Sequence, residues 1–191
     1  MSQDKRIVKT IANIKVSLCK LLETYKLEDI SITLLTKEAN ISRKTFYFHY
    51  NSVASVMTEI TNSIYDKLYN FVLEAKHQLS EVDKSIKKFY SIVLDDQMAL
   101  NILKNTTYGR DLLMIINKSI INALVKKYGD EINKNIPFML ALEYNMYGSN
   151  RMFYLLLKTT KNISFDDFVK VVSQQIKCGL AQYAHILENF Q

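Results

Sequence analysis

Glycine and proline are so scarce in this chain that they restrict the folds open to it. The 191 residues include four glycines and one proline. Because these two residue types supply most tight turns and interrupt helices, their scarcity argues against a turn-rich all-β protein and favours long helices. Hydrophobic residues make up 48% of the chain, enough for a core and too many for a disordered protein. The sequence therefore predicts an all-α fold.

The same residues argue against several classes of enzyme. The four glycines lie too far apart for either a G-x-G-x-x-G loop or a Walker A loop. Cys19 and Cys178 form no C-x-x-C pair, and the three histidines form no H-E-x-x-H motif. We therefore expect no catalytic residues, no metal site and no cofactor. Both cysteines are interpreted as small apolar fillers rather than redox sensors.

Charge and hydropathy indicate where the chain acts. No apolar run approaches the roughly 18 residues of a membrane helix, and the polar N-terminus lacks the apolar stretch of a signal peptide. We expect a cytoplasmic protein with no membrane partner and with reduced thiols. The net charge is +6, and residues 1–50 hold nine Lys and Arg against five Asp and Glu. This excess fits either a nucleic-acid-binding head or ordinary surface charge that keeps a protein soluble.

Apolar spacing and capping residues predict three helices in the first quarter of the chain. Apolar residues recur at intervals of three and four over residues 4–25, as on one face of a helix. Ser31 and Ser42 suit the N-caps of two short helices, ending near residues 39 and 50. Asn40 lies between these helices and tolerates the left-handed backbone of a tight turn. A long helix followed by helix, turn and helix is the layout of a helix-turn-helix head.

The remaining sequence predicts a helical body. A fourth helix, capped by Asn51 or Ser52 and running to about His77, joins a DNA-binding domain of residues 1–51 to a body of residues 52–191. In the body, Pro137 suits a first helical turn. Gly148 suggests a kink or a close helix contact. The further predicted helices span residues 81–95, 98–104, 108–128, 137–158 and 165–189.

The amino end of the third predicted helix carries the chemistry. Free N–H groups at a helix start favour phosphate. Arg43 and Lys44 can reach guanine O6 and N7 in a major groove, whereas Thr45, Tyr47 and His49 suit phosphate contacts. The alternative interpretation is that the aromatic residues of this helix are ordinary core. The predicted DNA-binding residues are Ser31, Thr33, Ser42, Arg43, Lys44, Thr45, Tyr47 and His49.

This stretch resembles the head of the TetR family of transcriptional regulators. Residues 31–50 read S-I-T-L-L-T-K-E-A-N-I-S-R-K-T-F-Y-F-H-Y, and the family motif runs approximately T-T-V-x-x-I-A-x-x-A-G-V-S-x-G-T-L-Y-x-Y-F. The form I-S-R-K-T-F-Y-F-H-Y is similar to a subgroup with R-x-T-F-Y-x-H-F. The motif covers about residues 5–65. The matching residues are Ser31, Ile32, Leu35, Ala39, Ile41, Ser42, Thr45, Phe46, Tyr47 and Tyr50.

Four positions depart from the family motif. Thr36 and Asn40 stand where Ala and Gly are usual. Lys44 replaces a common Gly and adds a cation that faces the groove. Val53 stands where many members carry Lys, which implies one phosphate contact fewer and a lower nonspecific affinity.

The resemblance implies a ligand cavity among the middle helices. Tyrosine presents an apolar body with one polar tip, which suits a small apolar or aromatic effector. The alternative is that most of the candidate residues belong to the core or to an interface. The candidates are Tyr65, Tyr69, Tyr90, Tyr108, Met114, Asn117, Tyr144 and Tyr147.

The resemblance also implies a homodimer on a palindromic operator. The final helix is apolar on more than one side, so one side faces its own body and another faces a partner, as in a four-helix bundle. The predicted dimer residues are Val171, Cys178, Ala181 and Tyr183. A monomer whose core surrounds this helix is the alternative.

These features together predict a transcriptional regulator that binds double-stranded DNA. We expect a repressor released by an effector, although an activator needs the same DNA contacts. The alternative is a helical adaptor that keeps the shape of the head but acts through a protein partner.

Overall fold

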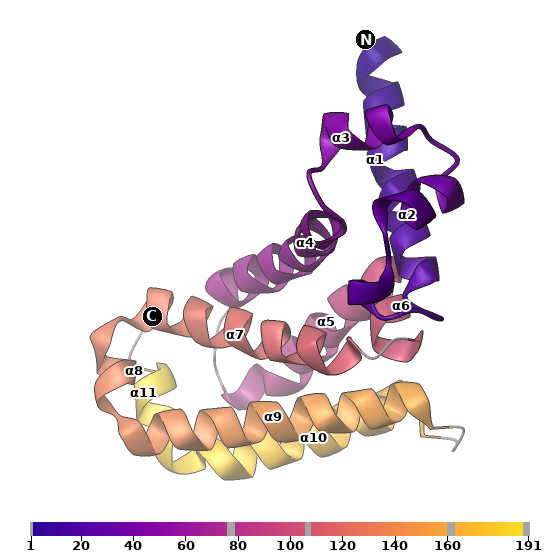
Figure 1. The fold of residues 1–191 in the computed structure, drawn as a ribbon. Helices are drawn as coiled ribbons and strands as arrows, with labels where there is room; N and C mark the ends of the chain where they lie inside the picture. The colour runs from indigo at the N-terminus through magenta and orange to yellow at the C-terminus, as the bar shows by residue number, and fades with distance from the viewer. Residues whose placement is uncertain (1, 76–78, 106–107, 160–162, 189–191) are drawn as a thin grey trace. The chain divides into compact units, whose positions relative to one another are not determined.

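The structure is a computed structural model that describes residues 2–75, 79–105, 108–159 and 163–188. Every regular element within these ranges is helical (Figure 1), which confirms the predicted all-α fold. None of the helices described combines the length and the apolar character that a membrane span requires. The α-helices are α1 (Ser2–Leu21), α2 (Ile32–Glu38), α3 (Arg43–His49), α4 (Val53–Glu74), α5 (Val82–Asp95), α6 (Gln97–Asn105), α7 (Gly109–Tyr128), α8 (Asp130–Lys134), α9 (Ile136–Lys158), α10 (Phe165–Leu180) and α11 (Ala184–Glu188).

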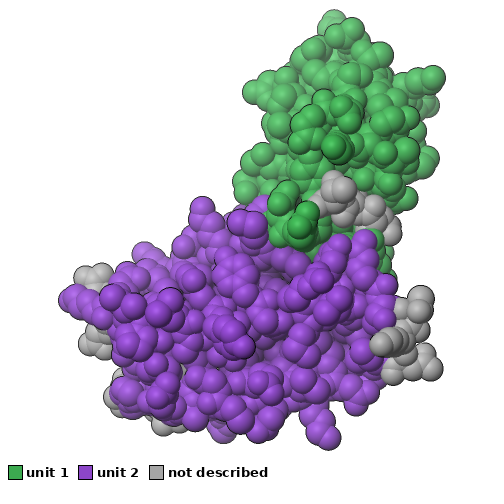
Figure 2. All heavy atoms as spheres, turned by 60° about the horizontal axis from the view of Figure 1, so that its bottom comes forward, with its two compact units in different colours: residues 1–64, 96–112 green, residues 65–95, 113–191 purple. Residues whose placement is uncertain are grey.

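The chain forms two compact units (Figure 2). Unit 1 comprises residues 1–64 and 96–112, and unit 2 comprises residues 65–95 and 113–191. The predicted boundary after residue 51 precedes α4, whereas unit 1 also includes the first half of α4, all of α6 and the start of α7. Side chains account for this addition, since the Asn101 amide of α6 donates to the Glu23 carboxylate over 3.0 Å. Helices α4 and α7 each contribute residues to both units.

Unit 1 is built on apolar side chains that are distant in sequence. Leu18 of α1, Leu35 of α2 and Phe46 of α3 are fully buried, as are Ile102 and Leu103 of α6. Burial of each such side chain stabilises the folded state by about 1.5–3 kcal/mol. A seven-residue helix is marginal in isolation, so α2 and α3 depend on this core for their stability.

The connection between α2 and α3 is a left-handed turn at Asn40. Asn40 has a φ of +50°. The Ile41 N–H donates to the Thr36 carbonyl over 3.0 Å, and the Asn40 N–H donates to the Lys37 carbonyl over 3.1 Å. These two bonds form a Schellman motif, which satisfies the last carbonyls of α2. The predicted turn is therefore confirmed.

The predicted N-caps are also present. The Ser31 hydroxyl accepts the Leu34 N–H over 3.1 Å, and the Ser42 hydroxyl accepts the Thr45 N–H over 3.0 Å. Each bond satisfies a backbone donor that the first turn of a helix leaves without a partner. The helix predicted to run to about His77 is described to Glu74, and His77 lies outside the described residues.

Unit 2 has an aromatic core contributed by α5, α9 and α10. The Tyr90 ring lies 4.5 Å from the Phe153 ring and 5.0 Å from the Phe168 ring, measured between centroids. All three side chains are buried. Edge and tilted arrangements of this kind add about 0.5–1.5 kcal/mol per pair beyond burial. Helices α9 and α10 are the most closely associated pair and lie side by side in Figure 1.

Two local predictions about the body were incomplete or wrong. The single last helix predicted over residues 165–189 instead ends at Leu180, and a short 3-10 turn precedes α11. The Tyr183 ring of that turn packs 5.4 Å from the Phe138 ring, a tertiary contact that local periodicity does not reveal. Gly129, with a φ of +65°, separates α7 from the short α8, which the periodicity missed.

The close contact suggested for Gly148 occurs instead at Gly179. A methyl group built on Gly148 meets no atom within 4 Å, and α9 runs through this residue. A methyl group on Gly179 would lie 2.5 Å from the Asn145 amide nitrogen. A larger residue at position 179 would therefore require the Asn145 side chain to move where α10 passes α9.

The turn at Asn40 leads to the first prediction. We expect Asn40→Ala to lower the free energy of unfolding by about 1 kcal/mol, because a β-carbon without a polar group is disfavoured in the left-handed region. Asn40→Gly should be at least as stable as the parent chain, since glycine adopts this conformation freely. Urea denaturation of the full chain measures both values. Equal stability of the alanine and glycine variants would contradict a left-handed turn.

Candidate nucleic-acid interface and ligand cavity

Helix α3 presents one side to the core and the other to solvent. Phe46 and Tyr50, one helical turn apart, are buried in unit 1. Arg43, Lys44 and Tyr47 are exposed. Because residues three or four apart share a helix face, the two aromatic anchors determine that the basic residues point outward.

Arg43 and Lys44 are cations without acidic partners in the part of the chain that the structure describes. Two other basic residues of unit 1 form ion pairs within the unit. Lys20 binds Glu38 with an N–O distance of 2.6 Å, and Lys15 binds Glu59 with an N–O distance of 2.7 Å. The Lys15 ammonium lowers the pKa of Glu59, which strengthens that pair. The positive charge on α3 therefore remains available for an anionic partner.

The hydroxyl-bearing candidates have structural bonds as well. The Ser42 and Thr45 hydroxyls lie 2.8 Å apart, and Ser42 also caps α3. Ser31 caps α2, while Thr33 is exposed. Since a hydroxyl both donates and accepts, a capping serine keeps the capacity for one further hydrogen bond.

Tyr47 and His49 complete the predicted set. The exposed Tyr47 ring meets the edge of the buried Phe46 ring at 5.9 Å, which limits its motion. The His49 ring is half-buried and lies 5.0 Å from the Phe48 ring. All eight predicted DNA-binding residues thus belong to α2, α3 or their caps.

Sequence reasoning missed Phe48. Its side chain is 76% exposed, although it is a large apolar group on α3. The signal was present in the spacing, because residue 48 lies half a turn away from Phe46 and Tyr50. Val53, where the family motif often has Lys, is buried at the start of α4 and contributes to the core of unit 1.

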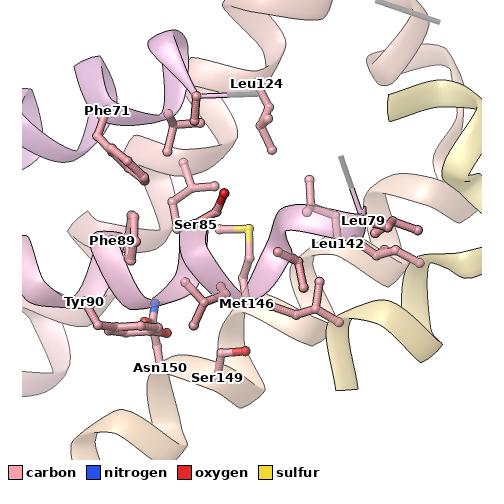
Figure 3. Close-up of a pocket in the computed structure, with 17 residues that line it drawn as sticks. Phe71, Leu79, Ser85, Phe89, Tyr90, Leu124, Leu142, Met146, Ser149 and Asn150 are labelled. Atoms are coloured by element: carbon pink, nitrogen blue, oxygen red, sulfur yellow. The ribbon is translucent and has the colours of Figure 1, made fainter. Parts of the chain in front are cut away.

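Unit 2 contains an apolar cavity of about 140 Å³. Figure 3 shows its walls, which come from the end of α4, from α5, and from α7, α9 and α10. Of the eight residues predicted to line a ligand cavity, Tyr90 alone does so. The lining includes Phe71, Val72, Ala75, Leu79, Val82, Ser85, Ile86, Phe89, Tyr90, Ile120, Leu124, Leu142, Met146, Ser149, Asn150, Ile176 and Leu180.

A buried chain of hydrogen bonds forms the polar part of this cavity wall. The Tyr90 hydroxyl donates to Asn150 Oδ1 over 2.7 Å, and Asn150 Nδ2 donates to Asn117 Oδ1 over 2.5 Å. All three residues are buried, and burial raises the pKa of Tyr90, so its hydroxyl stays protonated. Asn117, one of the predicted residues, therefore reaches the cavity through Asn150.

The other predicted ligand residues lie elsewhere. Tyr65 and Tyr69 stack on each other along α4, with ring centroids 5.7 Å apart. Tyr108 belongs to unit 1, where its hydroxyl donates to Glu28 over 2.9 Å. Three residues expose their side chains to solvent, namely Met114, Tyr144 and Tyr147.

The predicted dimer residues divide between two environments. Val171, Cys178 and Ala181 are exposed, and the first two lie on α10. Tyr183 is half-buried and packs against Phe138 within its own unit. Helix α9 adds further exposed apolar side chains, which sequence reasoning did not assign to a dimer face: Leu140, Tyr144, Tyr147 and Leu155.

The described residues contain no group of three His, Cys, Asp or Glu side chains arranged to hold a metal ion. Cys19 is buried, and burial raises the pKa of its thiol to about 11. A thiol with so high a pKa is a poor nucleophile at neutral pH.

No family model matches this sequence, and the search of curated proteins finds no match. Solved structures that resemble the chain include two transcriptional regulators. The TetR transcriptional regulator from Streptococcus agalactiae 2603V has a TM-score of 0.64 and 17% identity, over 92% of this chain and 98% of that one. The tetR-family transcriptional regulator from Streptomyces coelicolor has a TM-score of 0.60 and 13% identity, over 94% of this chain and 89% of that one. This chain therefore has the all-α fold of TetR-family transcriptional regulators.

Proposed function

We propose that this protein is a DNA-binding transcriptional regulator that binds a palindromic operator as a homodimer. One observation carries the proposal: α3 presents Arg43 and Lys44, without acidic partners among the described residues, beside the exposed Tyr47. The two solved regulators of the same fold support it.

In this proposal the exposed side of α3 enters the major groove. Arg43 and Lys44 donate to guanine O6 and N7, and a good bidentate pair contributes about 1–3 kcal/mol of base discrimination. Tyr47, His49 and Thr33 bind phosphate oxygens, which determines register rather than sequence. The hydroxyls that cap α2 and α3 bind the same strands while they retain their structural bonds.

The homodimer supplies the second head that a palindrome requires. Two half-sites on one face of a duplex lie about 34–36 Å apart, or a multiple of that distance. We propose that α9 and α10 form the dimer surface, through the exposed Val171, Cys178 and Ala181. The exposed Tyr144 and Tyr147 of α9 extend this apolar surface.

Regulation in this proposal is repression by occupancy. The dimer without effector holds both heads at operator spacing, and effector binding in unit 2 favours another spacing through α4, which belongs to both units. A coupling free energy of about 1–3 kcal/mol between the two sites suffices for such control. Activation would use the same DNA contacts.

Selection of bound duplexes from a random pool tests DNA recognition directly. We expect an inverted repeat, and binding that weakens steeply with salt, with a log–log slope near −0.9 for each phosphate contact. Fluorescence anisotropy over a salt series measures the slope. A flat salt response would favour a helical adaptor that acts through a protein partner.

Arg43→Ala should weaken binding to the selected duplex by roughly 1–3 kcal/mol and relax base preference at one position of each half-site. Tyr47→Phe should weaken binding to every duplex to a similar extent, because it removes a phosphate contact. The matched control is Arg110→Ala, which removes one exposed cation of unit 1 from α7 instead of α3. Unchanged binding in both α3 variants would show that another element enters the groove.

Sedimentation equilibrium tests the dimer surface. Val171 is 45% exposed and Tyr144 is 81% exposed, so an aspartate at either position leaves each folded protomer intact. We expect Val171→Asp and Tyr144→Asp to weaken dimerisation tenfold or more, because each buries an unpaired carboxylate. Met114→Asp changes a residue of α7 that is 59% exposed and should leave the dimer unaffected. Intact dimers of both α9 and α10 variants would exclude this surface.

A further inference from the structure

The wall of the cavity in unit 2 is uncharged. None of the seventeen described residues that line it carries a charge at neutral pH. Among the charged groups of the surrounding helices, the Lys88 ammonium lies 5.5 Å from the centroid of the Phe71 ring, and two other lysines have partners of their own. Lys127 donates to the carbonyls of Leu73 and Ala75 at the end of α4, and Lys177 binds Asp83. An ion that entered the cavity would lose part of its hydration and would meet no opposite charge among these seventeen residues, so the wall disfavours ions.

Three polar residues gather at one end of the cavity, and the Ser85 hydroxyl of α5 lies apart from them (Figure 3). Figure 3 shows Tyr90, Asn150 and Ser149 together there, opposite Phe71 and Leu124. The Ser149 hydroxyl donates to the Asn145 carbonyl over 2.6 Å. Asn150 uses one amide hydrogen on Asn117 and accepts from Tyr90. Its second amide hydrogen and a lone pair of the Tyr90 hydroxyl remain for one further partner.

The size of the cavity limits the ligand. Its volume of about 140 Å³ is close to that of an engineered apolar protein cavity of about 150 Å³, which stays dry and binds benzene. One aromatic ring with a small substituent fills such a space. Phe71, Leu124 and Met146 provide apolar contacts for the ring.

We propose that this cavity binds a small uncharged molecule of about one substituted aromatic ring, whose single polar group bonds to Asn150 and Tyr90. The site differs from the tyrosine-rich set that the sequence predicts. Its role as an effector site rests on the proposed function, whereas the binding itself does not. Phe71 and Val72 line the cavity from α4 and Ala75 from the residue that follows it, so an occupant touches the helix through which regulation is proposed to act.

Calorimetric titration of the full chain without DNA tests the ligand class. The probes are phenol, benzene, benzoate and benzylammonium. We expect saturable binding of phenol and benzene, with phenol several-fold tighter, and binding of benzoate and benzylammonium at least tenfold weaker than that of phenol. Equal binding of the two ions, or failure of both neutral probes to saturate, would overturn the proposal.

Variants then locate the site. Ala75→Phe fills the cavity from the end of α4, and Ser85→Leu fills it from α5. Each variant should abolish phenol binding, and one folded variant is enough for the test. Tyr90→Phe should remove the preference for phenol over benzene, a ratio that a general loss of stability does not change. Met114→Phe enlarges an exposed residue that does not line the cavity and should bind phenol normally. Phenol binding that survives both filling variants would overturn the assignment.

The two proposals fail separately. A chain that binds phenol but no duplex would refute the proposed DNA-binding function and leave the cavity assignment intact. A chain that binds its selected operator but neither neutral probe would refute the cavity assignment alone.

Discussion

Burial of Phe46 is the interaction on which the DNA-binding proposal depends. Helix α3 has seven residues and would not persist alone in water. Phe46, with Leu18 and Leu35 in the same core, holds it in place, and the Ser42 cap satisfies a backbone donor of its first turn. Phe46 and Tyr50 occupy the side of α3 that faces the core. The basic residues and Tyr47 therefore lie on the side that faces solvent. The residues that α3 exposes to solvent are thus determined by which of its residues are buried in the core.

The core of unit 2 buries polar groups together with its aromatic side chains. Tyr90 lies within an aromatic core, yet its hydroxyl and the amides of Asn150 and Asn117 are buried with it. Buried polar groups are costly unless they are paired, and here each finds a partner. The same hydrogen-bonded chain gives an otherwise apolar cavity one polar end. The three side chains that pair with one another in the core are therefore also those that provide the polar end of the proposed ligand site.

Helix α9 shows how one element serves two purposes. Leu142, Met146 and Ser149 line the cavity, whereas Leu140 and Tyr144 are exposed on another side. The difference is one of helical phase, since residues two apart point in very different directions. Tyr144 and Tyr147 are on the exposed side of α9, whereas Tyr90 of α5 is buried. The amphipathic period alone does not say which apolar side belongs to the core.

The sequence by itself determined the features whose interactions are local. The caps at Ser31 and Ser42, the left-handed turn at Asn40 and the limits of α2 and α3 all rest on hydrogen bonds between residues at most five apart. Only the tertiary structure decided which tyrosines face the cavity, where the last helix breaks, and that residues 96–112 belong with unit 1. These features depend on contacts such as Tyr90 with Asn150 or Asn101 with Glu23, between residues far apart in the chain. Such contacts leave no periodic signal, because their partners are chosen by packing rather than by spacing.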